Sequence, residues 1–502
     1  MNTKRILSLI LAALMLVPAL ASCDKDPSGT KDTDTSVNDT TPADTEPAET
    51  GLVLAKTDFG GTELRVMGVS EEVNFGYYAT KDIWREEDSA DPYESAIYQR
   101  VQDCIEKYNF TVTYVDDKSP INAVASMVSG GLDQVDLVFH SWGGMYIAAK
   151  GGNVLDLREV STIDLSGKWW DQNANEQLSI ANRLFYTTGE LTTIDDRCTR
   201  ALYFNKALAA AHDMESPYEL VRTNQWTFDK FAEMCRSVYD DVDGDGELGE
   251  DDVVGMFTEP DQFSYLMTAA GEKYAELDDT GLPVYTWLQN AEAVTKMETI
   301  AGFLIEDNTV FSVNDYTSYG SYSGKWTYAR SKFAAGKHLF SMGGALVITE
   351  FADMEDSYGI VPMPKWSSDQ TRYYHIVETS APMFGIPNTK ADASDVGYML
   401  EYFSYEGMET VTPTYKEKML KRRYAQDTDS ADMLDIIYAS KCFDIGYVGK
   451  WGNVTTIASS SINAGKMPSM TTFNRVAKSI PKLIQKDYDA YLVVGRDVED
   501  VE

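Results

Sequence analysis

Three short runs of sequence decide the fold: "ELRVMG" (Glu63–Gly68), "FTVTYVD" (Phe110–Asp116) and "VDLVFHS" (Val135–Ser141). The first two are typical of β-strands, and the third is a short, mostly apolar run typical of a buried strand. Between the first two, apolar residues recur every three or four positions over 93–108, which predicts an amphipathic helix. The run "INAVASMV" (Ile121–Val128) predicts a second helix. Strands that alternate with helices predict a mostly parallel sheet with helices on both faces.

The middle of the chain carries a second set of strand-like runs, with helical stretches between them. These runs are "RLFYTT" (Arg183–Thr188), "ALYFNKA" (Ala201–Ala207) and "GALVITEF" (Gly344–Phe351). From about Ala391 the pattern is mainly helical. In open α/β sheets, ligands bind beyond the carboxyl ends of the strands. Trp142, directly after "VDLVFHS", is therefore either a binding residue or a tryptophan that caps the core.

The N-terminus predicts export and a lipid anchor. Lys4 and Arg5 precede an apolar segment, Ile6–Leu20, which is too short to span a membrane stably. Cys23 follows this segment and two small residues, as in a bacterial lipobox, so we expect residues 1–22 to be removed and Cys23 to be lipidated. An ordinary signal peptide with a chance cysteine is the alternative. The lipobox predicts a protein anchored on the extracellular face of the bacterial cell membrane.

The composition of residues 23–51 predicts a flexible tether. The part from Asp24 to Thr50 holds eight acidic and two basic residues and no aromatic residue. Such a segment buries too little apolar surface to offset the entropy lost on ordering. The whole chain of 502 residues carries a formal net charge of −36, which excludes a nucleic-acid-binding protein because such proteins carry basic patches.

An acidic stretch, "YDDVDGDGELGEDDVVG" (Tyr239–Gly255), has the spacing of an EF-hand-type calcium loop. Gly246 permits the sharp turn, Leu248 is the apolar position, and Gly249 leaves one ligand position to water. A bound cation would neutralise carboxylates that otherwise repel one another, so we predict a structural calcium ion. An unoccupied, solvated surface loop is the alternative. The predicted ligands are Asp241, Asp243, Asp245, the carbonyl of Glu247, and Asp252.

Neither the cysteines nor the histidines have the spacing of a metal or redox motif. One or two disulfides and four buried free thiols are both compatible with an exported protein. The cysteines after Cys23 are Cys104, Cys198, Cys235 and Cys442, and the histidines are His140, His212, His338 and His375.

Four longer motifs follow one another: "GKWWDQNANEQLSIANRLFYTTGEL" (Gly167–Leu191), "YFNK" (Tyr203–Lys206), "QWTFDKF" (Gln225–Phe231) and "YGIVPMPK" (Tyr358–Lys365). Together with the acidic loop, they resemble the extracellular solute-binding lipoproteins of bacterial ABC importers, in the carbohydrate-type family. The resemblance covers nearly all of the chain after Gly51. It implies an α/β, two-lobed periplasmic-binding-protein-like fold (type II), in which each lobe is a mostly parallel sheet flanked by helices.

The same resemblance implies how the chain divides between the lobes. The first lobe takes residues 52–189 and 361–408, and the second takes residues 190–360 and 409–502, with the acidic loop inside the second. The hinge crossings would lie at "YTTGELTT" around Gly189, which supplies backbone freedom, and at "GIVPMP" around Pro362. Solute would bind in the cleft, and the hinge would close around it.

Sugar rings have apolar faces and polar edges, so a sugar site needs aromatic rings for stacking and carboxylates or amides for the hydroxyl groups. For each candidate tryptophan, packing in the core is the alternative. In "WWD" the adjacent side chains can diverge, so that one ring lies in the core and the other in the cleft. The candidate ligand-binding residues are Trp142, Trp169, Trp170, Asp171, Glu190, Tyr322, Trp326, Trp366 and Glu378.

The predicted function is capture of an extracellular solute, an oligosaccharide, by a monomer that delivers it to the permease of an ABC importer without catalysis. One alternative is a surface glycoside hydrolase, which needs two carboxylates about 5–10 Å apart. The sequence contains no Gly-x-Ser-x-Gly nucleophile elbow and no His-Glu-x-x-His zinc motif. A structural or adhesive surface lipoprotein is the other alternative.

Overall fold

The computed structural model places the folded elements in the second of two units, Met1–Gly51 and Leu52–Glu502. The predicted signal peptide, Cys23 and the tether lie outside the described residues. The structure describes residues 52, 55–73, 80–259, 261–315, 318, 320–351, 354–417 and 428–494.

The first sheet holds the three strands predicted at the start of the folded part and one strand from much later in the chain. They are β1 (Thr62–Val69), β2 (Phe110–Asp117), β3 (Leu137–Ser141) and β13 (Pro382–Gly385). Their order is β13-β3-β1-β2, with β1 parallel to β2 and β3 and with β13 antiparallel to β3. The prediction of a mostly parallel sheet is confirmed here.

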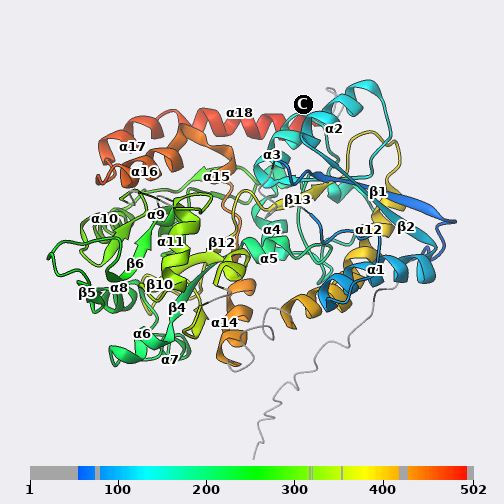
Figure 1. Cartoon of the computed structure of the whole chain (residues 1–502). Helices are drawn as coiled ribbons and strands as arrows, with labels where there is room; N and C mark the ends of the chain where they lie inside the picture. Colours follow the sequence, from blue (N-terminus) through cyan, green and yellow to red (C-terminus); the bar gives the residue numbers. More distant parts are fainter. Residues whose placement is uncertain are drawn as a thin grey trace, which may run out of the picture. The chain divides into compact units, whose positions relative to one another are not determined.

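Helices cover both faces of the first sheet. They are α1 (Pro92–Tyr108), α2 (Pro120–Gly130), α3 (Trp142–Lys150) and α12 (Ser394–Glu406). Figure 1 shows α2 and α3 on one side of the sheet and α1 and α12 on the other. The carboxylate of Asp91 caps α1 by accepting hydrogen bonds from the backbone of Tyr93 and Glu94, and Asn109, at φ 55°, ends the helix.

The second sheet has six strands and is mixed, where a mostly parallel sheet was expected. They are β4 (Arg200–Asn205), β5 (Tyr239–Asp240), β6 (Val253–Thr258), β9 (Val310–Ser312), β10 (His338–Gly344) and β11 (Tyr358–Val361). The order is β11-β4-β10-β6-β5, and β9 also pairs with β6. β6, β9, β10 and β11 run one way, and β4 and β5 run the other. The chain enters this sheet through β4 and leaves it through β11, so these neighbours run in opposite directions.

Helices flank the second sheet as well. They are α6 (Lys206–Ala211), α7 (Pro217–Arg222), α8 (Phe228–Arg236), α9 (Gln262–Ala269), α10 (Ala291–Glu306), α11 (Lys325–Ala334) and α14 (Thr428–Ala439). α8 begins at Thr227, whose hydroxyl accepts a hydrogen bond from the backbone of Lys230.

Shorter elements and the C-terminal helices complete the described part. The strands are β7 (Ala275–Leu277), β8 (Pro283–Tyr285), β12 (His375–Ile376) and β14 (Lys441–Cys442). The α-helices are α4 (Gln172–Gln177), α5 (Ile194–Cys198), α15 (Gly446–Gly449), α16 (Val454–Asn463), α17 (Met470–Ala477) and α18 (Ile480–Val493). The other helical turns are η1 (Leu157–Glu159), η2 (Ile180–Asn182), η3 (Ala345–Phe351), η4 (Gly407–Val411) and η5 (Trp451–Asn453).

Two predicted strands take other forms in the structure. In "GALVITEF" the strand β10 ends at Gly344, and the rest of the run forms η3. In "RLFYTT" the pairing is a single bridge, between Thr187 and Phe384. Each run contains buried apolar residues, Leu184 and Phe185 in one and Val347 and Ile348 in the other, and a short apolar run does not distinguish a strand from other buried structure.

The C-terminal helix α18 is bonded to α3, beside the first sheet. Asp487 of α18 accepts a hydrogen bond from the hydroxyl of Tyr146 and forms an ion pair of 2.5 Å with Lys150. The predicted division puts α18 in the second lobe, whereas these two bonds join it to α3, beside the first sheet. The boundaries of the lobes remain a prediction.

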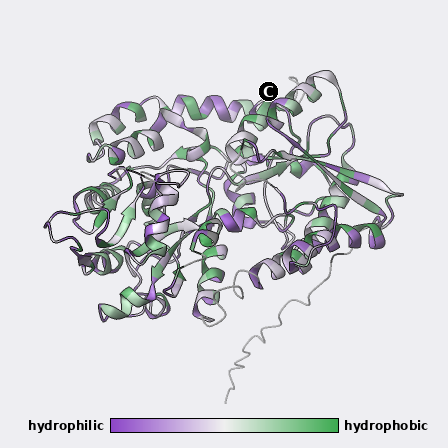
Figure 2. Ribbon diagram, in the orientation of Figure 1, coloured by the Kyte–Doolittle hydropathy of each residue, from purple (hydrophilic) through white to green (hydrophobic). Residues whose placement is uncertain are grey.

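A continuous hydrophobic core reaches both sheets, with Leu64 of β1 and Phe340 of β10 both fully buried in it. Figure 2 shows hydrophobic residues on strands such as β6 and more hydrophilic ones on helices such as α18. The four cysteines are free thiols and buried, which decides between the two alternatives left open by their spacing. Within the described residues, we find no helix with the length and apolar character of a membrane span.

The chain crosses between the sheets near Gly189 and Pro362. Gly189 is needed for close packing, because a Cβ atom there would lie 2.3 Å from the carbonyl oxygen of Trp169. Its φ lies outside the left-handed range, so the expected backbone freedom is not its role. At the other crossing, the indole N–H of Trp226 donates to the carbonyl of Pro362 over 2.7 Å.

Candidate functional site

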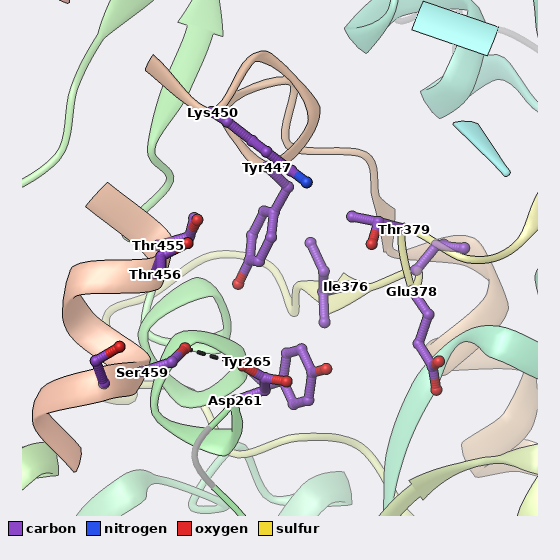
Figure 3. A pocket seen from close by; sticks show the side chains of 12 residues that line it. Asp261, Tyr265, Ile376, Glu378, Thr379, Tyr447, Lys450, Thr455, Thr456 and Ser459 are labelled. Atoms are coloured by element: carbon purple, nitrogen blue, oxygen red, sulfur yellow. Dashed lines mark hydrogen bonds between the residues drawn. The ribbon is translucent and has the colours of Figure 1, made fainter. Parts of the chain in front are cut away.

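A cavity of about 290 Å³ lies beside the segment that leads from β12 to β13, and we call it the hydroxyl-lined cavity. Its walls come from this segment and from α9, α15 and α16, as Figure 3 shows. Such a volume is at the small end of ligand pockets. The side chains used below are the carboxylates of Asp261 and Glu378, the rings of Tyr265 and Tyr447, the ammonium group of Lys450, and the hydroxyls of Thr379, Thr455, Thr456, Ser459 and Ser460.

The helix α16 presents hydroxyl groups to this cavity as a row. Thr455 and Ser459 are four residues apart, as are Thr456 and Ser460, so the four lie on one face of the helix. The hydroxyl of Ser459 donates to the carboxylate of Asp261 over 2.9 Å, which ties α16 to the start of α9 (Figure 3). The result is a wall of hydrogen-bonding groups held by two helices.

Arg200, at the start of β4, holds the opposite wall. Its guanidinium forms an ion pair of 2.8 Å with Glu378. It also lies 4.6 Å from the centre of the Tyr265 ring and donates to the Tyr265 hydroxyl over 3.2 Å. The ion pair and the ring together fix the positions of both Glu378 and Tyr265.

A further set of charged residues, Arg330, Glu350 and Glu259, lies near the carboxyl end of β6. Arg330 donates through Nε to Glu350 over 2.8 Å, and its Nη1 lies 3.7 Å from Glu259. Burial raises the pKa of Glu259 to about 7, although Arg200 and Arg330 both lower it. The sequence analysis missed Arg200, Glu259, Arg330 and Asp261. Glu259 and Asp261 directly follow a buried apolar run, and this position could have identified them.

Asp171 and Glu190 line a different cavity, of about 210 Å³, next to the first crossing. Lys441 of β14 forms ion pairs there with Asp171 at 3.0 Å, with Asp195 at 2.5 Å and with Asp196 at 2.6 Å. Glu190 accepts a hydrogen bond from Thr412, and burial, followed by the charge of Asp196, raises its pKa. The structure therefore separates Asp171 and Glu190 from Glu378.

Three of the candidate tryptophans are buried and pack against other aromatic residues. Trp142 is fully buried, lies 6.0 Å edge-on to Phe443, and donates its indole N–H to the carbonyl of Glu378. Trp170, 2% exposed, packs on Phe384 and donates to Glu401 over 2.9 Å. Trp169 lies edge-on to Tyr405 at 5.7 Å and is 7% exposed. Both tryptophans of "WWD" are buried, and Trp170 also lines the 210 Å³ cavity that holds Asp171 and Glu190.

The remaining aromatic candidates lie elsewhere. Trp366 is half-buried and stacks on Phe228, with ring centres 5.9 Å apart. Tyr322 and Trp326 are 44% and 48% exposed, close to the start of α11. Neither Tyr322 nor Trp326 is among the described residues that line the two cavities above.

The acidic loop brings three of its predicted ligands together. Three carboxylate oxygens, one each from Asp241, Asp243 and Asp252, lie within 4.8 Å of one another. Calcium–oxygen distances of about 2.3–2.6 Å would allow one ion to contact oxygens so arranged. Gly246 has a φ of 78°, in the left-handed range, as the predicted sharp turn requires. The donor set therefore fits a calcium ion.

The other two predicted ligands, Asp245 and Glu247, are not part of this cluster and form hydrogen bonds with neighbouring residues. The carboxylate of Asp245 accepts a hydrogen bond from the backbone of Glu247 over 2.8 Å, and the carbonyl of Glu247 accepts one from Tyr239. The backbone N–H of Asp245 lowers the pKa of Asp243, but desolvation and the neighbouring carboxylates raise it on balance. A cation would relieve this repulsion.

Comparisons with known proteins establish the fold. We find no protein-family model that matches the chain and no match among curated proteins. A cyclo/maltodextrin-binding protein complexed with maltotetraose is similar over 85% of this chain and 98% of that one, at 13% identity and a TM-score of 0.54. An ABC transporter solute-binding protein from Thermotoga lettingae, bound with α-D-tagatose, is similar over 84% and 100%, at 11% identity and a TM-score of 0.51.

A third solved structure shows that the ligands of such proteins vary. UgpB from Mycobacterium tuberculosis, in complex with glycerophosphocholine, is similar over 79% of this chain and 97% of that one, at 15% identity and a TM-score of 0.52. The predicted α/β class and solute-binding-protein fold are confirmed. At these identities, the solute must be argued from the site itself.

Proposed function

We propose that the protein captures a carbohydrate outside the cell and delivers it to an ABC importer. The hydroxyl-lined cavity is the observation that carries this proposal, because it places two carboxylates, two tyrosine rings and five hydroxyl groups around one small volume. Carboxylates and hydroxyls hydrogen-bond sugar hydroxyl groups, and tyrosine rings pack against the apolar faces of sugar rings. The solved structures with maltotetraose and with tagatose support the same class of solute.

The position of the cavity supports binding by hinge closure. Val377 and Glu378 line the cavity and belong to the segment that leads to β13, in the first sheet, while Tyr265 lies on α9, beside the second. A solute that binds both walls more tightly when they approach would favour the closed conformation. No chemical step is needed, so we propose a binding protein and not an enzyme.

Titration calorimetry with a panel of neutral oligosaccharides tests the proposal. We expect saturable binding of one class of sugar and no released monosaccharide after long incubation. Asp261→Asn should weaken that binding about 10-fold or more, because a hydrogen bond to a charged group contributes about 1.5–3 kcal/mol. Glu298→Gln, on the exposed face of α10, removes the same charge at a residue that does not line the cavity and serves as the control. Absence of binding by every sugar, or hydrolysis of one, would contradict the proposal.

We further propose that Cys23 is lipidated, that residues 23–51 tether the binding domain, that it works as a monomer with a permease, and that the acidic loop holds a structural calcium. The lipobox spacing supports the first of these. Metabolic labelling with a fatty acid in a bacterial host should mark the protein, and Cys23→Ser should abolish the label and release the protein from the membrane. Label that persists in Cys23→Ser would contradict the anchor.

A further inference from the structure

The C-terminal helices are basic in a chain that is acidic overall. From Ile445 to Lys486 the sequence has no aspartate or glutamate and six lysine or arginine residues, while the whole chain has a formal net charge of −36. Four of these basic residues lie on α17, on α18 or at their junction, and their side chains are exposed. We call this set the basic face, and its members are Arg475, Lys478, Lys482 and Lys486.

The spacing of the basic face follows the helical turn. Lys482 and Lys486 are four residues apart on α18, and Lys478 lies four residues earlier, at the junction with α17. Lys478 and Ser479, which join the two helices, keep right-handed helical φ and ψ angles, and the backbone N–H of Leu483 donates to the carbonyl of Ser479. A lysine therefore follows on each successive turn.

Lys482 and Lys486 lie on the side of α18 that faces away from the rest of the folded part. The opposite side of this helix is buried, through Ile480, Ile484, Asp487 and Tyr491. Figure 1 shows α17 and α18 along one edge of the view, with α18 reaching from α17 to α3. The lysines of α18 are therefore open to a partner that approaches this edge.

The charges of the basic face are not neutralised within the described part of the chain. None of its four residues forms an ion pair with a described residue. The next acidic residues are already engaged, because Asp487 pairs with Lys150 and Asp489 accepts a hydrogen bond from Gln485 over 2.7 Å. Like charges four residues apart destabilise a helix, so this row of lysines has a cost that an approaching anion would remove.

An apolar side chain lies among these charges. Leu483, next to Lys482 on α18, is 40% exposed. Helices that bind the surface of a membrane combine basic residues with exposed apolar side chains. Lysines act as point charges without a fixed geometry, and the basic face lines neither of the two cavities described above. Such a row fits a plane of anionic headgroups better than a shaped protein surface.

The predicted lipid anchor would keep this face close to such a plane. Residues 23–51 span at most about 100 Å when fully extended, so a lipid on Cys23 would hold the folded part near the membrane. At so short a distance the effective concentration of membrane is high, and a weak attraction suffices. Charges are screened over about 8 Å at physiological salt, so the basic face is attracted although the net charge of the chain is negative.

We propose that the basic face docks on the anionic phospholipid surface that holds the lipid anchor, and so orients the binding domain on the membrane. The four basic side chains lie near the lipid phosphates, and Leu483 enters the headgroup layer. This contact goes beyond the capture of a solute, because the basic face does not line the hydroxyl-lined cavity. It needs the proposed anchor only for proximity to the membrane.

Lysine footprinting on vesicles tests the proposal. The chain from residue 23 onward is coupled through Cys23 to a maleimide lipid, since the other four cysteines are buried. The vesicles contain either phosphatidylcholine alone or equal parts of phosphatidylcholine and phosphatidylglycerol, and mass spectrometry measures the acetylation rate of each lysine.

We expect Lys478, Lys482 and Lys486 to react at least about 3-fold more slowly on the anionic vesicles, and salt at about 0.5 M to remove the difference. Lys81 and Lys118, exposed near β1 and β2, are the internal controls and should react equally on both.

Paired variants show which charges hold the face on the membrane. Arg475→Gln with Lys478→Gln should restore most of the acetylation rate of Lys482 and Lys486. Lys81→Gln with Lys118→Gln removes the same charge elsewhere and should leave the slowing intact.

Three results would overturn the proposal. Equal acetylation rates on neutral and anionic vesicles, or equal slowing of all five lysines, reject docking of this face on lipid. Slowing that is absent on lipid vesicles and appears only in bacterial membranes that contain the importer assigns the face to an acidic protein partner instead. None of these results bears on carbohydrate capture, which the titration with neutral oligosaccharides tests separately.

Discussion

Lys441 meets three carboxylates in a buried setting, where one ammonium group neutralises only one of them. The charges of Asp171, Asp195 and Asp196 therefore repel one another around it. Burial raises the pKa of Asp195 to about 7, although Lys441 lowers it. The pKa of Lys441 is raised, since these carboxylates outweigh its own desolvation. A proton retained on Asp195 near neutral pH relieves the repulsion.

This residue should make stability depend on pH. The folded pKa of Asp195 lies above its value of about 3.9 in an unfolded chain, so folding binds a proton. Its contribution is complete at low pH and is lost as the pH rises through about 7. We expect the melting temperature measured by calorimetry to fall between pH 5 and pH 8, and Asp195→Asn to reduce that fall by a few degrees. Asp279→Asn, an exposed site, is the control, and an unchanged pH profile in Asp195→Asn would contradict the assignment.

Gly189 gives a second prediction for a single residue. Gly189→Ala places a Cβ atom 2.3 Å from a backbone oxygen of Trp169, which forces the crossing to shift. We expect a loss of about 1–3 kcal/mol in the free energy of unfolding, measured by urea denaturation. Gly324→Ala is the matched control, because nothing lies within 4 Å of its Cβ position. Equal stability of the two variants would show that the close approach does not matter.

The sequence could predict single site residues only in part. Glu378 was predicted, and the structure places it in the hydroxyl-lined cavity beside Arg200. The buried positions of Trp142 and Trp170 depend on Phe443 and Phe384, which come from distant parts of the chain. A tryptophan has the same local signal in a core and in a cleft, so only the tertiary contacts distinguish them.

At the scale of elements, the acidic loop between β5 and β6 carries the next prediction. Its carboxylates repel one another unless a cation binds, so removing calcium should destabilise the protein. We expect EDTA to lower the melting temperature by several degrees and added calcium to restore it. Asp241→Asn should abolish this response, while Asp240→Asn, next to it in β5, should retain it. A melting temperature indifferent to EDTA would reject the calcium site.

The elements themselves were predicted to different degrees. The alternating and apolar runs were sufficient to predict the strands β1, β2 and β3, because each has a clear period or is a short buried run. The direction of β4 was not predictable, because it follows from where the chain enters the second sheet. η3 was mistaken for a strand because a buried apolar run has no period to distinguish the two.

At the scale of the whole molecule, hinge closure should change the dimensions of the protein. A solute that joins α9 to the segment before β13 brings the two walls of the hydroxyl-lined cavity together. We expect the radius of gyration from small-angle X-ray scattering to decrease when the preferred sugar is added. Asp261→Asn at the same sugar concentration should show a smaller decrease. Identical scattering with and without bound sugar would reject closure.

Leu248 connects the acidic loop with a cavity of about 440 Å³ at the carboxyl end of β6. It belongs to the loop by sequence, and it lines the cavity while packing against the small core cluster around Phe257 and Phe311. A metal that orders the loop would therefore also set the shape of this wall of the cavity. The shape of this cavity would then respond to the level of divalent ions in the surroundings, through a residue whose side chain does not bond to the ion.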